Sequence, residues 1–261
     1  MKLRNTFIRI CAFIFLSMIM AACATTPRST MDADTQEKLA HIHYQLGIDA
    51  LGKEGMLPKA FDELMKSNTI QPNQPHVLDA LAYAWLLRGD LKKSESYYIQ
   101  ALQYGPRASI YNNYASLLNR LELYKKAEQN ARHALDDPRY PNQDLAFINL
   151  GNALLGQLKY PEAIKNFQQA KLFNPSNALS DYRIAYTYFK QNKLREARLL
   201  YEALIRKQAG NRNAVEGMLA VLNKQHDNPQ ARAVLNAFAQ QTSSPLDKAW
   251  ALNQIKRLDR P

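Results

Sequence analysis

The chain has 261 residues and a formal net charge of +11, from 34 basic and 23 acidic side chains. It contains two cysteines and five histidines, and no Gly-rich phosphate loop, nucleophile elbow or HExxH motif occurs in it. Only His41 and His43 lie close together in the sequence, and the single residue between them points their rings to different faces of a helix. We therefore expect no enzyme activity, metal, cofactor or small-molecule substrate.

Residues 1–22 have the pattern of a lipoprotein signal peptide. Three basic residues precede an apolar run over residues 10–20, which is too short to span a bilayer as a mature helix. The run ends in the sequence MAAC, from Met20 to Cys23, which resembles a bacterial lipobox. In a lipobox the cysteine is acylated and becomes the mature N-terminus. The alternative is an ordinary signal peptide that is cut nearby, with Cys23 incidental.

We expect Cys23 to carry the lipid, including palmitate. The other cysteine, Cys11, lies inside the signal peptide, so cleavage and acylation leave no free thiol, which suits an oxidising periplasm. More than one acyl chain gives a stable membrane anchor. Ala24 follows the cysteine, where lipoproteins retained in the inner membrane tend to have aspartate. By resemblance to lipoproteins in general, we expect a lipid-anchored protein on the periplasmic face of the outer membrane.

Residues 23–39 are predicted to form the acylated N-terminus and a flexible tether. The segment from Ala24 to Lys38 is rich in Thr, Ser, Asp and Lys and has no apolar periodicity. A coil of this length reaches about 20 Å on average and about 50 Å when fully extended. Removal of the signal leaves 31 basic against 23 acidic residues, a charge of +8. In the periplasm such a chain meets lipid headgroups and acidic protein segments, so we expect no nucleic-acid partner.

Residues 40–244 carry six copies of one pattern. Large apolar residues surround a recurring small residue, and a proline closes several of the copies. The intervals between the small residues are 34, 33, 36, 34 and 34, at Ala60, Ser94, Ala127, Ala163, Ala197 and Ala231. These positions resemble the tetratricopeptide repeat, a helix hairpin of about 34 residues in which a small residue lets the helices cross closely.

Residues 245–261 have the apolar spacing of one more helix, which we expect to cap the exposed face of the last repeat. With no alternating strand pattern and no heptads, the sequence predicts an all-α fold. We therefore expect a right-handed superhelical solenoid of six tetratricopeptide repeats with a C-terminal capping helix.

The first helix of each hairpin is predicted to line the concave face of the solenoid. Tyrosines, apolar residues and asparagines alternate there with few charges, and an asparagine amide offers both a donor and an acceptor to an extended peptide backbone. The alternative for each asparagine is that it caps a helix or bridges adjacent repeats. The predicted peptide-binding groove comprises Tyr44, Tyr83, Asn112, Asn113, Asn149, Asn152 and Tyr186.

One known kind of groove is incomplete in this sequence. Tetratricopeptide proteins that grip the C-terminal carboxylate of chaperones use a set of Lys, Asn and Arg side chains from three consecutive repeats. Asn149 and Arg183 fit two of those roles, whereas the others fall on Asn112, Ser116 and Leu179. A chaperone-tail adaptor is therefore not favoured.

The lipobox, tether and six repeats together resemble the type IV pilus biogenesis and stability lipoproteins of the PilF/PilW kind, the pilotins. The more specific parts of the resemblance are YNNYA at 111–115, Tyr140–Pro141, and FINLG at 147–151. The resemblance implies that the protein binds the outer-membrane secretin subunit and promotes its membrane insertion and multimerisation. The alternative is an adaptor lipoprotein for another envelope machine, such as murein hydrolases or β-barrel assembly.

Overall fold

A computed structural model of the chain describes residues 32–258. The signal peptide, Cys23 and the first part of the predicted tether lie outside the described residues. Over the described range the chain forms thirteen helices and no strand. Their bounds are α2 (Ala33–Leu51), α3 (Leu57–Ile70), α4 (Pro75–Arg88), α5 (Leu91–Tyr104), α6 (Ala108–Arg120), α7 (Tyr124–Leu135), α8 (Gln143–Gly156), α9 (Tyr160–Phe173), α10 (Ala178–Lys190), α11 (Leu194–Lys207), α12 (Arg212–Lys224), α13 (Asn228–Gln241) and α14 (Pro245–Leu258).

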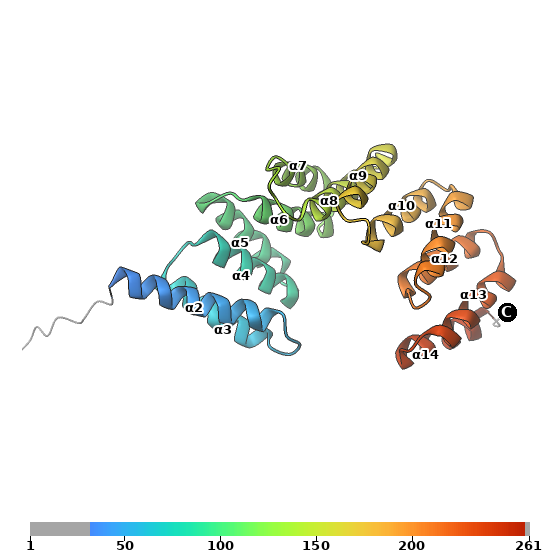
Figure 1. Cartoon of the computed structure of the whole chain (residues 1–261), viewed down its shortest axis with the longest axis horizontal. Coiled ribbons are helices and arrows are strands. Elements are labelled where there is room, and N and C mark those ends of the chain that lie inside the picture. The colour runs from blue at the N-terminus through green and yellow to red at the C-terminus, as the bar shows by residue number, and fades with distance from the viewer. Residues whose placement is uncertain (1–31, 259–261) are drawn as a thin grey trace, which may run out of the picture.

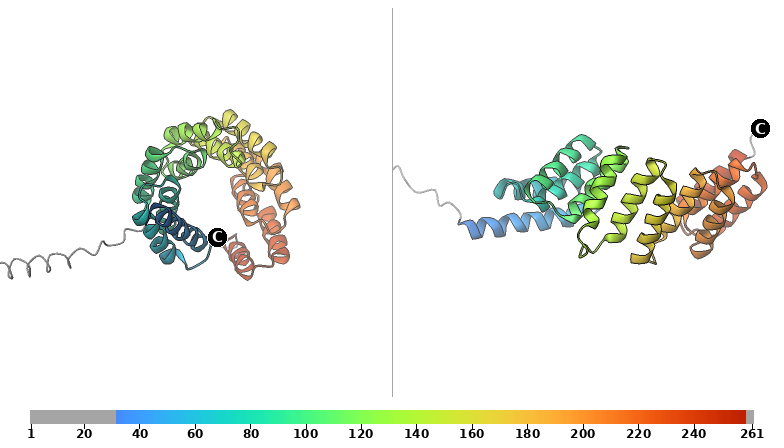
Figure 2. Two further views of the ribbon diagram at one scale, coloured as in Figure 1. Left: turned by 60° about the vertical axis from the view of Figure 1, so that its left-hand side comes forward. Right: turned by 90° about the horizontal axis from the view of Figure 1, so that it is seen from above.

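Consecutive helices pack as hairpins, α2 with α3 and so on to α12 with α13, and successive hairpins stack in a row (Figure 1). Most first helices of neighbouring hairpins contact each other: α2 contacts α4, α4 contacts α6, α6 contacts α8, and α10 contacts α12. The second helices make no comparable contacts within the described part of the chain. The first helices therefore lie on the inner side of the curve, which Figure 2 shows as an open ring from one direction and as a row of hairpins from another.

The recurring small residues lie where the helices cross. Each of the six is at most 3% exposed. The glycine at the crossing of α8 and α9 makes the close approach explicit, because a Cβ atom on Gly151 would lie 2.5 Å from Cε1 of Phe167. Phe167 itself is fully buried beside Ala163. The predicted all-α class and the role of the small residues at the helix crossings are confirmed.

The turn inside each hairpin contains one residue in the left-handed backbone region. These residues are spaced by the same intervals as the small residues, so the turn geometry repeats along the chain. Two of them are glycines, which adopt this conformation without steric cost. The six residues are Gly55, Gly89, Glu122, Leu158, Asn192 and His226.

The helical region begins seven residues before the predicted boundary at Ala40. The prediction of a flexible tether is therefore wrong for residues 33–39, which are helical. Helix α2 begins at Ala33 because the side chain of Asp32 accepts a hydrogen bond from the backbone N–H of Thr35, at 2.8 Å. An ion pair between Asp34 and Lys38 supports the first turns. This turn of helix is exposed, so it extends the first hairpin rather than adding to the core.

Helix α14 covers the last hairpin. Its Trp250 ring meets the buried ring of Phe238 edge-on, with centroids 5.8 Å apart. Ile255 and Leu258 also pack against the cluster that contains Val215. The apolar face of α13 is thereby kept from water, as a terminal repeat requires. In the range from 32 to 258, no helix combines the length and the apolar character needed to cross a membrane.

Candidate peptide-binding site on the inner face

A pocket of about 460 Å³ lies on the inner side of the solenoid, where α6, α8 and α10 stand next to one another. We call it the inner-face pocket. Each of the three helices contributes residues spaced by three or four positions, which puts their side chains on one helix face. The pocket is lined by Ser116, Asn119, Arg120, Tyr124, Asn149, Asn152, Leu155, Gly156, Leu158, Arg183, Tyr186 and Lys190.

Three buried polar atoms in this pocket have no hydrogen-bond partner among the described residues. They are Oδ1 of Asn119, Oδ1 of Asn152 and Nε of Arg183. The side-chain amide of Asn119 donates a hydrogen bond to the backbone oxygen of Asn149 at 2.9 Å. Its side-chain oxygen remains available to accept a hydrogen bond from a ligand. Unpartnered buried polar groups are costly, so their concentration in one pocket points to a ligand that completes them.

The charge of the pocket is positive. Arg120, Arg183 and Lys190 line it, and no aspartate or glutamate does. None of the three cations forms an ion pair with any described residue. Two carboxylates lie two residues away from these cations along the chain: Glu122 is exposed in the turn after α6, and Asp181 pairs with Lys171 at 2.7 Å. The pocket is therefore suited to an anionic group.

Aromatic rings form the apolar part of the pocket. Tyr124 packs against Gly156 so closely that a Cβ atom on the glycine would lie 2.3 Å from the ring. The Tyr186 ring lies nearly parallel to that of Tyr182, with an interplanar angle of 9° and centroids 6.4 Å apart. The Nζ atom of Lys190 lies 6.0 Å from the centroid of Tyr186. These rings are held in place by their own packing and can support an extended segment without reordering.

Asn112 does not belong to the predicted groove, and its assignment is corrected. Its side chain is only 4% exposed, and its Oδ1 and backbone oxygen accept hydrogen bonds from Nδ2 of Asn149 at 2.8 and 3.2 Å. Asn112 therefore bridges α6 to α8. Asn149 takes part in the same bridge but also lines the inner-face pocket, as do Asn152 and Tyr186.

The other predicted groove residues lie nearer the N-terminal end of the inner face. Tyr44 is half-buried and meets His76 edge-on at 4.5 Å between centroids, whereas Tyr83 is 44% exposed. Nδ2 of Asn113 donates to both carboxylate oxygens of Asp79, at 3.1 and 3.2 Å. Burial raises the pKa of the Asp79 carboxyl, and the hydrogen bond from Asn113 acts in the opposite direction. Asn113 thus supports a buried acid, so the structure does not bring all seven predicted residues into one site.

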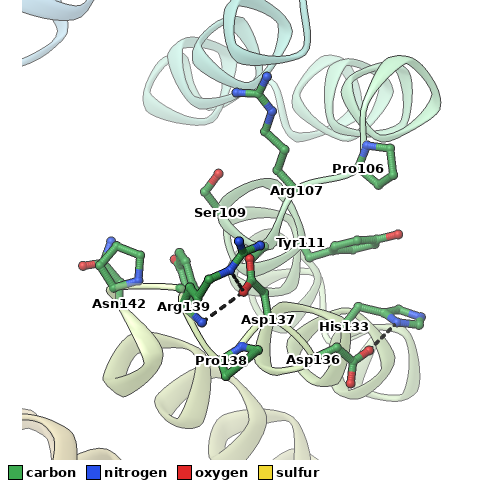
Figure 3. A pocket seen from close by; sticks show the side chains of 13 residues that line it. Pro106, Arg107, Ser109, Tyr111, His133, Asp136, Asp137, Pro138, Arg139 and Asn142 are labelled. Carbon is green, nitrogen blue, oxygen red and sulfur yellow. Dashed lines mark hydrogen bonds and ion pairs between the residues drawn. The ribbon is translucent and has the colours of Figure 1, made fainter.

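A wider hollow of about 980 Å³ lies beside the segment that joins α7 to α8 (Figure 3). Apart from Arg107, its basic and acidic side chains are already paired: His133 binds Asp136 at 3.2 Å, and Nε of Arg139 binds Asp137 at 3.2 Å. The side chain of Arg107 extends away from both of these pairs. No set of unpartnered groups converges here, so we consider the inner-face pocket the better candidate site.

Sequence reasoning matched Arg183 to one role of the carboxylate-gripping groove but missed Arg120 and Lys190. Both lie in the last turn of a first helix, beyond the positions that the repeat pattern assigns to the groove. A usable signal exists, since Arg88 and Lys224 occupy the last turns of two other first helices. Basic residues are common at helix C-termini because their positive charge interacts favourably with the negative end of the helix dipole. Their presence there is therefore not specific evidence for a binding site.

No protein-family model and no curated protein matches the sequence. Solved structures do match. PilF of Pseudomonas aeruginosa is 22% identical with a TM-score of 0.66, and the match covers 84% of this chain and 99% of that one. PilW, described as a widely conserved type IV pilus biogenesis factor, is 17% identical with a TM-score of 0.72, covering 82% and 99%. YrrB, described as a tetratricopeptide protein with an unusual peptide-binding site, is 17% identical with a TM-score of 0.55, covering 71% and 91%.

The chain has the tetratricopeptide-repeat fold. For two of the three structures, the likeness covers more than four fifths of this chain. In this fold the first helices line the inner side, which is the side that carries the inner-face pocket.

Proposed function

We propose that the protein is a lipid-anchored scaffold of the outer membrane that binds the secretin subunit of a type IV pilus machine and promotes its membrane insertion and multimerisation. The observation that carries the proposal is the inner-face pocket, whose unpartnered amide and guanidinium groups can bind another polypeptide. The likeness of the fold to PilF and PilW supports the choice of the pilus machine over other envelope machines. The role is one of binding and assembly rather than catalysis.

The anchor and the solenoid act together in this proposal. Acylated Cys23 holds the chain on the membrane, and nine residues separate it from the start of the helical region at Ala33. A linker of that length reaches at most about 30 Å. The inner face is thereby kept close to the membrane in which the secretin is inserted, which raises its effective concentration there.

The anchor is tested by Cys23→Ser. We expect this variant to lose acylation and to remain as an unprocessed or soluble form, because serine cannot form the thioether that carries the lipid. The measurement is metabolic labelling with palmitate, followed by separation of the membranes. Palmitate label that persists in Cys23→Ser would contradict the lipoprotein assignment. The control is Ser17→Ala, a substitution in the apolar run, which should keep the label.

The inner face is tested by the double variant Tyr83→Ala and Asn152→Ala. Neither side chain makes a hydrogen bond in the described structure, so the fold should be retained. Loss of one buried hydrogen bond costs about 1–3 kcal/mol and loss of a tyrosine anchor more than about 2. We expect the affinity of the mature chain for the purified periplasmic part of the secretin to fall by about 100-fold or more.

The matched control is Tyr104→Ala with Asn236→Ala, which removes an exposed tyrosine and an exposed asparagine from two second helices. This variant should bind like the parent. Equal binding by the parent and by the inner-face variant would contradict the proposed site. Binding to a murein hydrolase or to a β-barrel assembly component, with none to the secretin, would favour the rival adaptor function.

A further inference from the structure

We propose that the inner-face pocket is built for an acidic side chain within an extended segment of the partner, and that Arg183 is the cation that anchors it. The inference rests on the proposed function only for the identity of the partner. The chemistry of the ligand follows from the groups that line the pocket.

The first step is the state of Arg183. It is the least exposed of the three cations in the pocket, because Arg183 is partly buried whereas Arg120 and Lys190 are exposed. Its Nε is buried without a hydrogen-bond partner, and its only described interaction through the guanidinium is with the Tyr182 ring, 6.0 Å from the centroid. A carboxylate can accept hydrogen bonds from the N–H groups of a guanidinium in a charge-assisted pair. This is the strongest hydrogen-bonding partner available to the Arg183 side chain.

The second step distinguishes a peptide from a simple anion. The pocket also presents two buried oxygen acceptors, Oδ1 of Asn119 and Oδ1 of Asn152. A phosphate or a free carboxylate offers acceptors and would leave these oxygens unpartnered. A peptide backbone offers N–H donors beside its acidic side chains, so one extended segment can complete the oxygens and the guanidinium together.

The third step favours a residue inside a segment over a chain end. A second hollow of about 400 Å³ lies on the other side of Arg183, lined in part by Tyr182, Asn211 and Asn213. Because Arg183 lines both hollows, the surface continues from α6 to α12 past the anchoring cation. A segment that runs along this surface passes Arg183 rather than ending there.

The test is a selection from a library of random dodecapeptides displayed on phage, carried out on the immobilised mature protein. We expect the selected peptides to be enriched in Asp and Glu. Synthetic versions with amidated C-termini should keep their affinity, whereas replacement of their Asp and Glu by Asn and Gln should abolish it. Selection of no peptides, of peptides without acidic enrichment, or of peptides that require a free C-terminus would overturn the proposal.

Arg183 is tested with the selected peptides. Arg183→Gln should weaken binding by about 10-fold to 100-fold, the loss typical of a hydrogen bond to a charged group. Arg183→Lys should recover part of it, and Arg195→Gln, on the exposed side of α11 in the same hairpin, should bind like the parent. Circular dichroism shows whether Arg183→Gln is folded. If it is not, the test uses the affinity of Arg183→Lys and the decrease of peptide affinity with increasing salt. Undiminished binding by Arg183→Gln, or by Arg183→Lys where Arg183→Gln does not fold, would overturn the proposal.

The same variants separate this inference from the proposed function. Binding to vesicles that contain phosphatidylglycerol is measured for the parent and for Arg183→Gln. If the parent binds the vesicles through Arg183 and the library yields no peptide, the ligand of the pocket is a lipid headgroup and the inference is overturned. Acidic peptides that bind through Arg183, together with normal secretin multimers in a strain carrying Arg183→Gln, would uphold the pocket chemistry and contradict the secretin partner.

Discussion

Glu128 shows how one side chain ties two neighbouring hairpins together. Its carboxylate accepts hydrogen bonds from Arg132 on its own helix at 2.8 Å and from Gln157 after α8 at 2.7 Å. Nζ of Lys159 lies 3.2 Å away. Partial burial by itself would raise the pKa of the Glu128 carboxyl, but these three partners lower it to about 2. The charged form is therefore favoured by the folded state.

The pH dependence of unfolding tests this link. Because the pKa of Glu128 is lower in the folded chain than its ordinary value of 4.5, its contribution is fully present above that value and is lost as the pH falls towards about 2. We expect Glu128→Gln to lower the free energy of unfolding by about 1–3 kcal/mol at neutral pH. The difference from the parent should shrink in acid.

Urea denaturation over a range of pH values measures this effect. Asp49→Asn removes an exposed i,i+4 ion pair with Lys53 and is the control, which should cost less than about 0.5 kcal/mol. A Glu128→Gln effect as small as that of the control, or one that stays constant into acid, would contradict the link.

Adjacent residues also show where reasoning from the sequence loses its resolution. Asn112 and Asn113 were both predicted to face the groove, yet neighbouring residues on a helix point about 100° apart. The structure buries Asn112 against Asn149 and turns Asn113 towards Asp79. The repeat pattern predicts which side of a helix faces the inner surface. It does not predict which polar side chains on that side are already hydrogen-bonded to the next hairpin.

At the scale of the element, the turns inside the hairpins carry a conformational cost that varies along the chain. A left-handed backbone costs an ordinary L-residue roughly 1–2 kcal/mol, and asparagine tolerates it better than leucine does. Leu158 has φ 61° and is 65% exposed, so its side chain gains little from burial. Four of the six turns lack glycine, which is why the sequence alone did not reveal this geometry.

Leu158→Gly tests the turn geometry. We expect it to raise the free energy of unfolding by about 1 kcal/mol, because glycine removes the steric cost at this backbone angle. Thermal or urea unfolding followed by circular dichroism gives the difference. Asn192→Gly, at the equivalent turn, is the comparison and should gain less. A destabilised Leu158→Gly variant would show that the leucine side chain contributes more than its backbone costs.

At the scale of the whole molecule, the repeat interval determined how well the fold could be predicted. Small residues at a regular interval are required wherever two helices cross closely, so the sequence pattern predicts the number and order of the helices and the inner position of the first ones. The start of α2 was missed because its first turns are polar and depend on the Asp32 cap rather than on core packing. The cations at the rim of the pocket were missed because basic residues at helix ends have a general electrostatic reason to be there.

The central claim is that the solenoid assembles a secretin, and secretin multimers in the outer membrane measure it most directly. Heat-resistant multimers are quantified by gel electrophoresis in a strain from which the gene for this chain is deleted. We expect the multimers to be lost in that strain, to return with the parent chain, and not to return with the chain carrying Tyr83→Ala and Asn152→Ala. Multimers at the normal level in the deletion strain would contradict the account.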